Sequence, residues 1–369
     1  MNRSGMPVLA TLFACTLFNF AGPSVSACFL ESQTQSNGPD ISQLQTQANG
    51  GDSIAQLKLA RAYARGDGVP QDEQMAGQWY RKAAEQGNAE AQDSLGQMYL
   101  TGQGVDQDKR QAVAWFHKSA HQGNASAMFH LGAAYYNGDG VDINDSLSYA
   151  WFTLAKEAGN PKAAEAVQRA ESELKANRII RAYKNIAEMY EKGGFLPENQ
   201  PEAARWWLKA AKEGDDDAQV AIAVKFINGQ GVTQDFNQGK EWCNKAAKEN
   251  NGPGEYCLGY MAQHGMGGAS NPKEARKRYE LAAHSGHHRA MKALAQMEAD
   301  GKGGKVDRVG ACLLYARVAA VGDQDALRSL AKLKKEVAPK DWQKIEKQLP
   351  ALRIDPTKLN YALTQTENR

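Results

Sequence analysis

Two clusters of residues in the last third of the chain have side chains that could do chemistry. His284, His287 and His288 could bind zinc, but they lack partnered cysteines and the helical spacing that zinc enzymes use. The segment Gly301-Lys302-Gly303-Gly304-Lys305 has the glycines and lysines of a phosphate-binding loop. It follows a helical pattern instead of a strand, and no Lys-Ser or Lys-Thr pair closes it. We therefore expect a solvated loop at the first cluster and an expanded turn at the second.

Acidic clusters are equally poor candidates for catalysis or metal binding. Asp215-Asp216-Asp217 lies at a helix connection, where capping and solvation explain the acids without chemistry. The loops Gly66-Asp67-Gly68 and Gly138-Asp139-Gly140 lack the carboxylate density that a calcium site requires. No nucleophile has a general base near it in the sequence. The chain is therefore predicted to be no enzyme and to use no cofactor and no metal.

Three cysteines, Cys243, Cys257 and Cys312, lie in the last third, and their spacing is not that of a metal site. Cys243 and Cys257 fall near the facing ends of two antiparallel helices and are the candidates for a disulfide. One of them lies roughly a turn too far from the connecting loop for good bonding geometry. Buried free thiols are therefore the alternative.

The first 27 residues resemble an export signal, with Arg3 ahead of an apolar run at residues 8–20. That run is shorter than the roughly 18 to 20 residues that cross a bilayer. Val25-Ser26-Ala27 fits cleavage by signal peptidase, and together with Cys28 it also resembles a lipobox. The protein is therefore predicted to be periplasmic, either soluble or tethered to a membrane through a lipid on Cys28.

Composition indicates a folded chain without a polyanionic partner. The 44 basic and 42 acidic side chains nearly cancel, so no net field attracts nucleic acid. With 42% hydrophobic residues, the chain can bury a large core.

Two series of residues recur every 36 positions, which predicts a solenoid of helix pairs. Each unit begins with a small residue: Ala55, Ala91, Ala127, Ala182, Ala218, Gly254 and Ala290. Four positions later comes a core leucine or isoleucine followed by a small residue: Leu59-Ala60, Leu95-Gly96, Leu131-Gly132, Ile186-Ala187, Ile222-Ala223, Leu258-Gly259 and Leu294-Ala295. The small residue should let a neighbouring helix approach closely.

The turn between the two helices of each unit is also marked. A glycine should end the first helix in a left-handed conformation: Gly66, Gly102, Gly138, Gly193, Gly229, Gly265 and Gly301. Six positions later an Asp or Asn should cap the second helix: Asp72, Asp108, Asn144, Asn199, Asp235, Asn271 and Asp307. The second helix then carries Trp79, Trp115, Trp151, Trp206 or Trp242, which we expect to be packed between repeats.

This pattern resembles the Sel-one-like repeats, which are short relatives of the tetratricopeptide repeat. The motif Ala-x3-Leu-Gly-x2-Tyr-x2-Gly-x-Gly-Val is complete from residue 91, and the resemblance covers residues 55–325. It departs at Phe195-Leu196-Pro197, and Arg278 and Leu314 replace the tryptophan of the last two units, so these units should be looser or differently contacted. The resemblance implies an all-α fold, a right-handed α-solenoid superhelix of helix-turn-helix repeats.

A half repeat between the third and fourth units divides the chain. After the signal peptide at 1–27, residues 28–54 should hold a tether and an N-terminal cap helix. Residues 55–181 should form a first array of three repeats closed by a capping helix at 163–177, and residues 182–325 a second array of four repeats. Residues 326–369 should hold a C-terminal cap helix at 326–337, a short helix at 341–349 and a tail that is poorly ordered beyond Pro356.

If the tetratricopeptide geometry applies, the first helices build a concave surface. Its inward positions hold Arg61, Arg65, Gln97, Phe129, Tyr136, Lys184, Glu188, Glu191, Tyr256, Tyr260 and His264. Tyrosine and arginine are favoured at binding hot spots, so the aromatic members are the best candidates for anchors of a protein partner. Alternatively, each of them packs locally.

The resemblance implies a non-enzymatic adaptor that binds a protein on its concave face. Similar proteins serve as immunity proteins that neutralise secreted toxic effectors, as periplasmic signalling regulators and as scaffolds for polysaccharide export. A small exported binder without catalytic residues favours effector immunity, with a secreted effector or an envelope protein as the partner. A peptidoglycan or polysaccharide binder is the second hypothesis. A cell-wall or lactam hydrolase is the third, although the chain lacks a visible active site.

Overall fold

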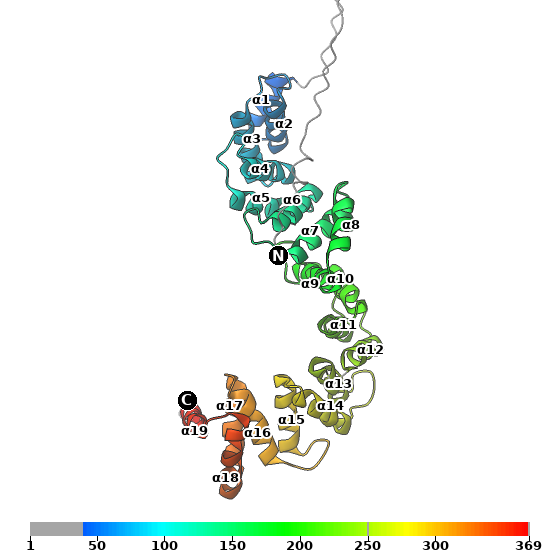
Figure 1. Ribbon diagram of the computed structural model, residues 1–369, viewed down its shortest axis with the longest axis vertical. Helices are drawn as coiled ribbons and strands as arrows, with labels where there is room; N and C mark the ends of the chain where they lie inside the picture. The colour runs from blue at the N-terminus through cyan, green and yellow to red at the C-terminus, as the bar shows by residue number, and fades with distance from the viewer. Residues whose placement is uncertain (1–39, 249–250, 368–369) are drawn as a thin grey trace, which may run out of the picture. The chain divides into compact units, whose positions relative to one another are not determined.

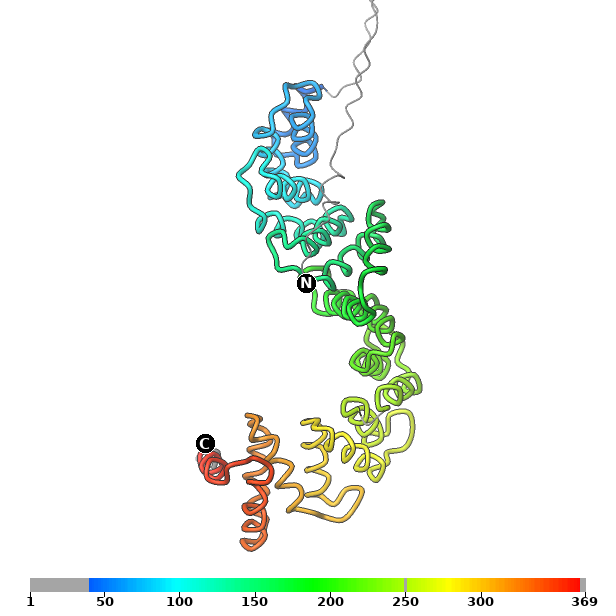
Figure 2. The backbone as a smooth tube through the Cα atoms, viewed as in Figure 1, coloured from blue at the N-terminus to red at the C-terminus, as the bar shows by residue number. Residues whose placement is uncertain are grey.

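The computed structural model describes residues 40–248 and 251–367, and in these two ranges every regular element is a helix (Figure 1). Seven helix pairs follow one another in chain order, as the backbone trace in Figure 2 shows. The first helices are α2 (Ser53–Arg65), α4 (Ala89–Thr101), α6 (Ala125–Asn137), α9 (Ala176–Lys192), α11 (Asp216–Asn228), α13 (Gly252–His264) and α15 (His288–Asp300). The second helices are α3 (Glu73–Glu85), α5 (Lys109–His121), α7 (Asp145–Glu157), α10 (Gln200–Lys212), α12 (Phe236–Ala246), α14 (Pro272–His284) and α16 (Arg308–Ala319). The predicted α-solenoid is confirmed.

Five further helices lie outside these pairs. They are α1 (Ile41–Asn49), α8 (Ala163–Glu173), α17 (Gln324–Lys334), α18 (Pro339–Gln348) and α19 (Pro356–Glu367), with a 3-10 turn at Leu349–Leu352. The helix α1 packs on α2 and α17 packs on α16, so each covers one end of the series of pairs.

The core follows the predicted spacing. Leu59, Leu95, Leu131, Ile186 and Ile222 are fully buried. Where the small residue is glycine, it makes room for a ring on the second helix of the same unit: a Cβ at Gly96, Gly132 or Gly259 would lie 2.6, 2.5 or 2.7 Å from the ring of Phe116, Phe152 or Tyr279. The predicted close approach is therefore made by an aromatic side chain.

The tryptophans of the second helices are buried, as expected for packing residues. Trp151 and Trp206 have no exposed surface. At three other units a lysine one turn later covers the ring, with Lys82, Lys118 and Lys245 Nζ 3.8–3.9 Å from the ring centres. These stacked lysines keep their charge near water while their stems cover the rings.

Asp and Asn side chains cap the N-termini of both helices in most units. All seven predicted caps of the second helices accept a backbone N–H of the first turn. The first helices are capped in the same way, except α9, and these caps follow the same spacing: Asp52, Asn88, Asn124, Asp215, Asn251 and His287. Side-chain capping satisfies amide groups that the helix itself leaves unpaired.

At four of the Gly-x-Gly turns, the second glycine lies against a backbone carbonyl of the preceding unit. A Cβ at Gly140 would lie 2.2 Å from the carbonyl oxygen of Lys109, at the start of α5. The equivalent distances are 2.1 Å at Gly104, 2.0 Å at Gly231 and 2.2 Å at Gly303. Only glycine permits this backbone contact, so the turn sets how closely successive units stack.

The fourth unit is contacted differently from the others, as its departure from the motif predicted. Six of the seven glycines that end first helices are left-handed, but Gly193 has φ 70° and ψ −156°. The altered turn packs on α5, where the Phe195 ring stacks on His117 at 4.3 Å and His121 Nδ1 lies 3.0 Å from the Gly194 carbonyl oxygen. Burial lowers the pKa of His117 to about 4. The turn of the fourth unit thus contacts the second helix of the second unit.

The half repeat differs from its prediction. A single helix over 163–177 is wrong: α8 ends at Glu173 and α9 begins at Ala176, before the expected start of the fourth unit at Ala182. Leu174 is in an extended conformation and breaks the helix. The helix α7 packs against both α8 and α9, so the series of pairs continues past α8. The division into two arrays stays a prediction.

The C-terminal tail also differs from its prediction. The expected poor order beyond Pro356 is wrong, because α19 packs on α17. Leu359 and Leu363, four positions apart, lie on one face of α19 and are 6% and 1% exposed. The spacing that buries them is that of an amphipathic helix.

The predicted signal peptide, the lipidation candidate Cys28 and the first part of the tether lie outside the described residues. Within the described ranges, no helix combines the length and apolar character needed to cross a membrane.

Candidate binding surface

Several first helices contact the first helix of the next unit. The helix α13 packs on both α11 and α15. Ion pairs also join neighbouring units: Arg61 of α2 with Glu90 of α4 at 2.7 Å, and Lys292 of α15 with Asp323, the cap of α17, at 2.7 Å. We call the residues at the predicted inward positions the first-helix surface.

The charged residues predicted for partner binding are paired within the chain. Lys184 Nζ lies 3.0 Å from Asp215 and 3.0 Å from Asp217 at the start of α11. Glu188 pairs with Lys192 at 2.8 Å. Glu191 accepts from the Trp207 indole at 3.2 Å and from the buried Lys225 at 2.8 Å. The contacts of Lys184 with α11 and of Glu191 with Lys225 join neighbouring units, whereas Glu188 pairs within α9. The charges are therefore only partly available to a partner.

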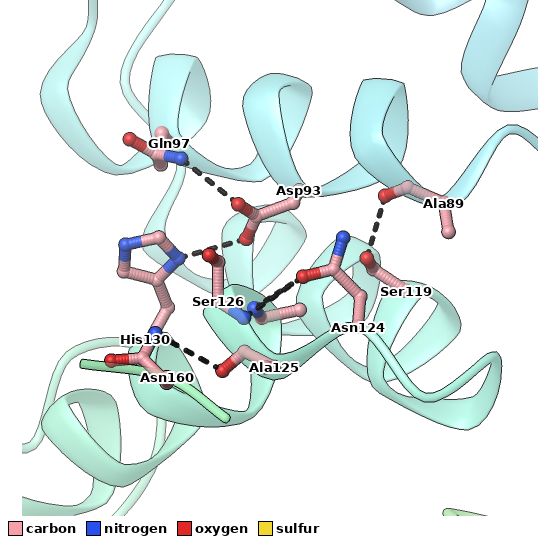
Figure 3. A network of polar contacts seen from close by, with 10 residues as sticks. Ala89, Asp93, Gln97, Ser119, Asn124, Ala125, Ser126, His130 and Asn160 are labelled. Carbon is pink, nitrogen blue, oxygen red and sulfur yellow. Dashed lines mark hydrogen bonds and ion pairs between the residues drawn. The ribbon is translucent and has the colours of Figure 1, made fainter. Parts of the chain in front are cut away.

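A buried polar network joins α4 and α6 on the same surface (Figure 3). Asp93 Oδ1 lies 2.8 Å from His130 Nδ1, and Gln97 donates to Asp93 Oδ2 at 3.1 Å. The Asp93 carboxylate is 9% exposed and the His130 ring 17%. Gln97, a predicted site residue, therefore positions Asp93. Phe129, another predicted residue, packs its ring 5.3 Å from that of Phe152.

The Asp93–His130 pair is the arrangement nearest to catalytic machinery on this surface. An Asp–His pair activates a nucleophile only when the second ring nitrogen reaches a hydroxyl or thiol. Ser126 lies beside the pair in Figure 3, but its hydroxyl makes no hydrogen bond to His130 among the described residues. The described ranges also contain no group of three or more His, Cys, Asp and Glu side chains placed to hold a metal. The pair therefore connects two units and forms no nucleophile–base arrangement.

Aromatic side chains on α13 form the least polar part of the first-helix surface. The ring centres of Tyr256 and Tyr260 are 6.3 Å apart, and those of Tyr260 and His264 are 4.3 Å apart. Tyr256 also lies 4.8 Å from His287 and 5.6 Å from Tyr279. Burial raises the pKa of Tyr256. Two of the predicted anchor residues, Tyr256 and Tyr260, are thus brought together with His264 in one strip.

The strip continues onto α11 through Val220 and Val224, at the positions equivalent to Tyr256 and Tyr260. Val224 and Tyr260 are each 39% exposed. We call Val220, Val224, Tyr256, Tyr260 and His264 the Tyr260 patch. Tyr136, the remaining predicted aromatic residue, lies half-buried on α6, away from this patch in the sequence of helices.

The sequence analysis missed several residues of the surface. Asp93 occupies the position equivalent to Tyr256, so the 36-residue spacing contained the signal. His287 was expected in a solvated loop. Its Nδ1 instead accepts the Ala290 N–H at 3.2 Å, so His287 is the N-cap of α15. Burial, together with Arg289 and His288, lowers the pKa of His287. A neutral imidazole with a free lone pair suits this capping role.

Cys243 and Cys257 form a disulfide between α12 and α13, with 5.8 Å between their Cα atoms. Their positions are equivalent to those of Phe116 and His130, whose rings meet at 5.0 Å at another junction between units. The disulfide thus occupies the place that a ring contact holds at the junction of the second and third units. Cys312 is a buried free thiol whose pKa is raised to about 12 by burial.

Reduction should weaken this junction. The disulfide spans 14 positions, and closing a loop of this size stabilises a chain by about 3 kcal/mol. We expect dithiothreitol to lower the urea midpoint of the protein. The double variant Cys243→Ser/Cys257→Ser should have the low midpoint with or without reductant. An unchanged midpoint on reduction of the natural protein would show that the bond does not support the fold.

Comparison with protein families finds the Sel1 repeat at residues 53–88, 89–124, 125–160, 180–215, 216–251 and 253–287. The seventh helix pair follows these matches and carries Glu298 and Leu314 at the aromatic and tryptophan positions. No curated protein matches the chain.

Two repeat proteins are among the solved structures that are similar to this chain. Protein c5321, described as a protective antigen in uropathogenic Escherichia coli strains displaying an SLR fold, is 29% identical, covers 85% of this chain and 71% of its own, and gives a TM-score of 0.43. A Sel1 repeat protein from Oxalobacter formigenes is 26% identical, covers 85% of this chain and 98% of its own, and gives a TM-score of 0.38. Since the six family matches cover more than half of the sequence, the chain belongs to the Sel1 repeat family.

Proposed function

We propose that this protein is a non-enzymatic scaffold of the bacterial envelope that binds a protein partner on its first-helix surface, centred on the Tyr260 patch. Sel1 repeat proteins generally mediate protein–protein interactions and are scaffolds without a catalytic role. One observation carries the assignment to this surface: an exposed tyrosine within a strip of aromatic and aliphatic side chains on adjacent first helices. Aromatic residues of this kind dominate the energetics of protein interfaces.

The envelope location rests on separate support. The N-terminal sequence resembles an export signal, and the Cys243–Cys257 disulfide suits an oxidising compartment. Under this proposal the protein is periplasmic, either free or tethered through Cys28. Labelling with a radioactive lipid precursor, compared between the natural protein and Cys28→Ser, distinguishes the two forms.

Affinity capture from envelope extracts tests the binding proposal. We expect one protein to be recovered in a stoichiometric amount, and Tyr260→Ala to reduce its recovery at least about tenfold, because loss of a hot-spot tyrosine removes more than 1 kcal/mol of binding free energy. Tyr361→Ala is the matched control, since Tyr361 is 70% exposed on α19. Equal recovery with both variants would refute the assignment to this surface, and recovery of peptidoglycan or glycan alone would favour the polysaccharide hypothesis.

Effector immunity is the narrower form of the proposal. A small exported binder with no nucleophile–base pair on its surface suits an inhibitor that acts by occupying its target. If the captured partner is a secreted toxic effector, its expression in the periplasm should stop growth, and co-expression of this protein should restore it. A partner that is harmless alone would instead favour signalling or export roles.

A further inference from the structure

The Tyr260 patch lies beside positive charge that no carboxylate of the described chain neutralises. Arg289, on the first turn of α15, is exposed and makes no ion pair among the described residues. Its charge and that of Lys292 reach the Tyr256 hydroxyl, where both oppose the rise in pKa that burial causes. Tyr260 and Arg289 also occupy the positions equivalent to Arg61 and Glu90, which meet at 2.7 Å across two neighbouring first helices. His287, two positions before Arg289, lies 4.8 Å from Tyr256 between ring centres, so the guanidinium lies beside the aromatic strip.

Acidic side chains around the patch are already engaged. On α13, Glu255 is buried and pairs with Arg278 at 3.0 Å. Asp217 at the start of α11 pairs with Lys184, and Asp216 accepts from Asn251 at 3.1 Å. Beyond α15, Asp323 pairs with Lys292 at 2.7 Å.

The arrangement combines two recognition elements at neighbouring positions. Val224 and Tyr260 offer exposed apolar surface on α11 and α13. Arg289 offers a fork of donors that matches a carboxylate in a bidentate geometry. An apolar surface next to an unpaired arginine is complementary to an apolar side chain next to an acidic one.

We propose that the Tyr260 patch binds an extended acidic segment of the protein partner, in which an Asp or Glu pairs with Arg289 while an adjacent apolar side chain packs on Tyr260 and Val224. This inference rests on the proposed protein-binding function and specifies the chemistry of the partner. Arg289 determines the charge preference, and Tyr260 provides the apolar contact. Lys292 does not take part directly, because it holds the cap of α17.

Selection from a random peptide library displayed on phage tests the inference without knowledge of the partner. The natural full chain, Arg289→Glu and Tyr260→Ala are immobilised in parallel, with Arg317→Glu on α16 as a charge control distant from the patch. On the natural protein we expect enrichment of peptides with Asp or Glu next to Leu, Phe or Trp. A synthetic peptide of the enriched sequence should bind about tenfold more weakly to Arg289→Glu than to the natural protein. This difference in affinity should become smaller at high salt, where the charge contributes little.

The outcomes distinguish a failure of the acidic-segment inference from a failure of the protein-binding proposal on which it rests. Acidic peptides that bind the natural protein and the Arg317→Glu control, but bind neither Arg289→Glu nor Tyr260→Ala, support the inference. Peptides that require Tyr260 but contain no acid, or that ignore Arg289→Glu, overturn it and leave the protein-binding proposal intact. Equal enrichment on Tyr260→Ala, or no enrichment of any peptide on the natural protein, overturns the inference and counts against the proposed function as well.

Discussion

Replacing Gly140 by alanine should lower the free energy of unfolding by about 3 kcal/mol, because two costs coincide at this residue. Gly140 has φ 76°, a conformation that costs an L residue about 1 kcal/mol. The new methyl group would also lie 2.2 Å from the Lys109 carbonyl oxygen and 2.8 Å from the Arg110 nitrogen, so the turn must move away from α5.

Gly123→Ala is the matched control. Gly123 has φ 84°, but a Cβ there would meet nothing within 4 Å. The control should therefore cost only the conformational term, about 1 kcal/mol. Urea unfolding of both variants, with hydrogen exchange of the amides in α5 and α7, checks the prediction. Equal losses in the two variants would mean that the close approach between units does not contribute.

Raising the pH from 5 to 8 should destabilise the protein through Glu298, which replaces the aromatic residue found at this position in most units. The Glu298 side chain is 12% exposed, and its Oε2 is buried without a hydrogen-bond partner in the described structure. Burial, reinforced by Asp307 and Glu280 and opposed by Arg276, raises the pKa of Glu298 from 4.5 to about 7. The Arg276 guanidinium lies 3.4 Å from the other carboxylate oxygen.

The sign of the effect follows from proton binding. Between pH 4.5 and 7 the folded protein holds a proton on Glu298 that the unfolded chain releases. Stability from this group is therefore complete at low pH and is lost as the pH rises through that interval, by about 2–3 kcal/mol in total. The effect concerns the seventh helix pair most directly, since Glu298 lies on α15 next to the cap of α16.

Glu298→Gln removes the titrating group and retains its shape. We expect the variant to match the natural protein at pH 5 and to be more stable at pH 8. Glu90→Gln serves as the control, because the Glu90 side chain is 58% exposed on α4 and is not among the charges that act on Glu298, so its loss should leave the pH slope nearly unchanged. Thermal unfolding at several pH values measures these slopes. A natural protein whose stability does not fall above pH 5, or a Glu298→Gln variant that retains the fall, would contradict the assignment.

The sequence predicted the repeat well because the features that form it are local. A core leucine, a small residue after it, a glycine at the helix end and an Asx cap act within one unit, and each recurs at the same interval. The same spacing would have identified Asp93 and the first-helix caps. Prediction was poorer where the repeat is interrupted, since α8, the start of α9 and the packing of α19 depend on contacts outside any single unit.

The sequence by itself determined the all-helical class, the order of the helix pairs and the residues facing the core. Only the tertiary structure decided which surface residues are free to act. Lys184 and Glu191 were candidates beside Tyr260 in the sequence, but partners from neighbouring units occupy them. The physical reason is that periodicity places a side chain on a face of its helix, whereas its availability depends on the residue that the next unit presents opposite it.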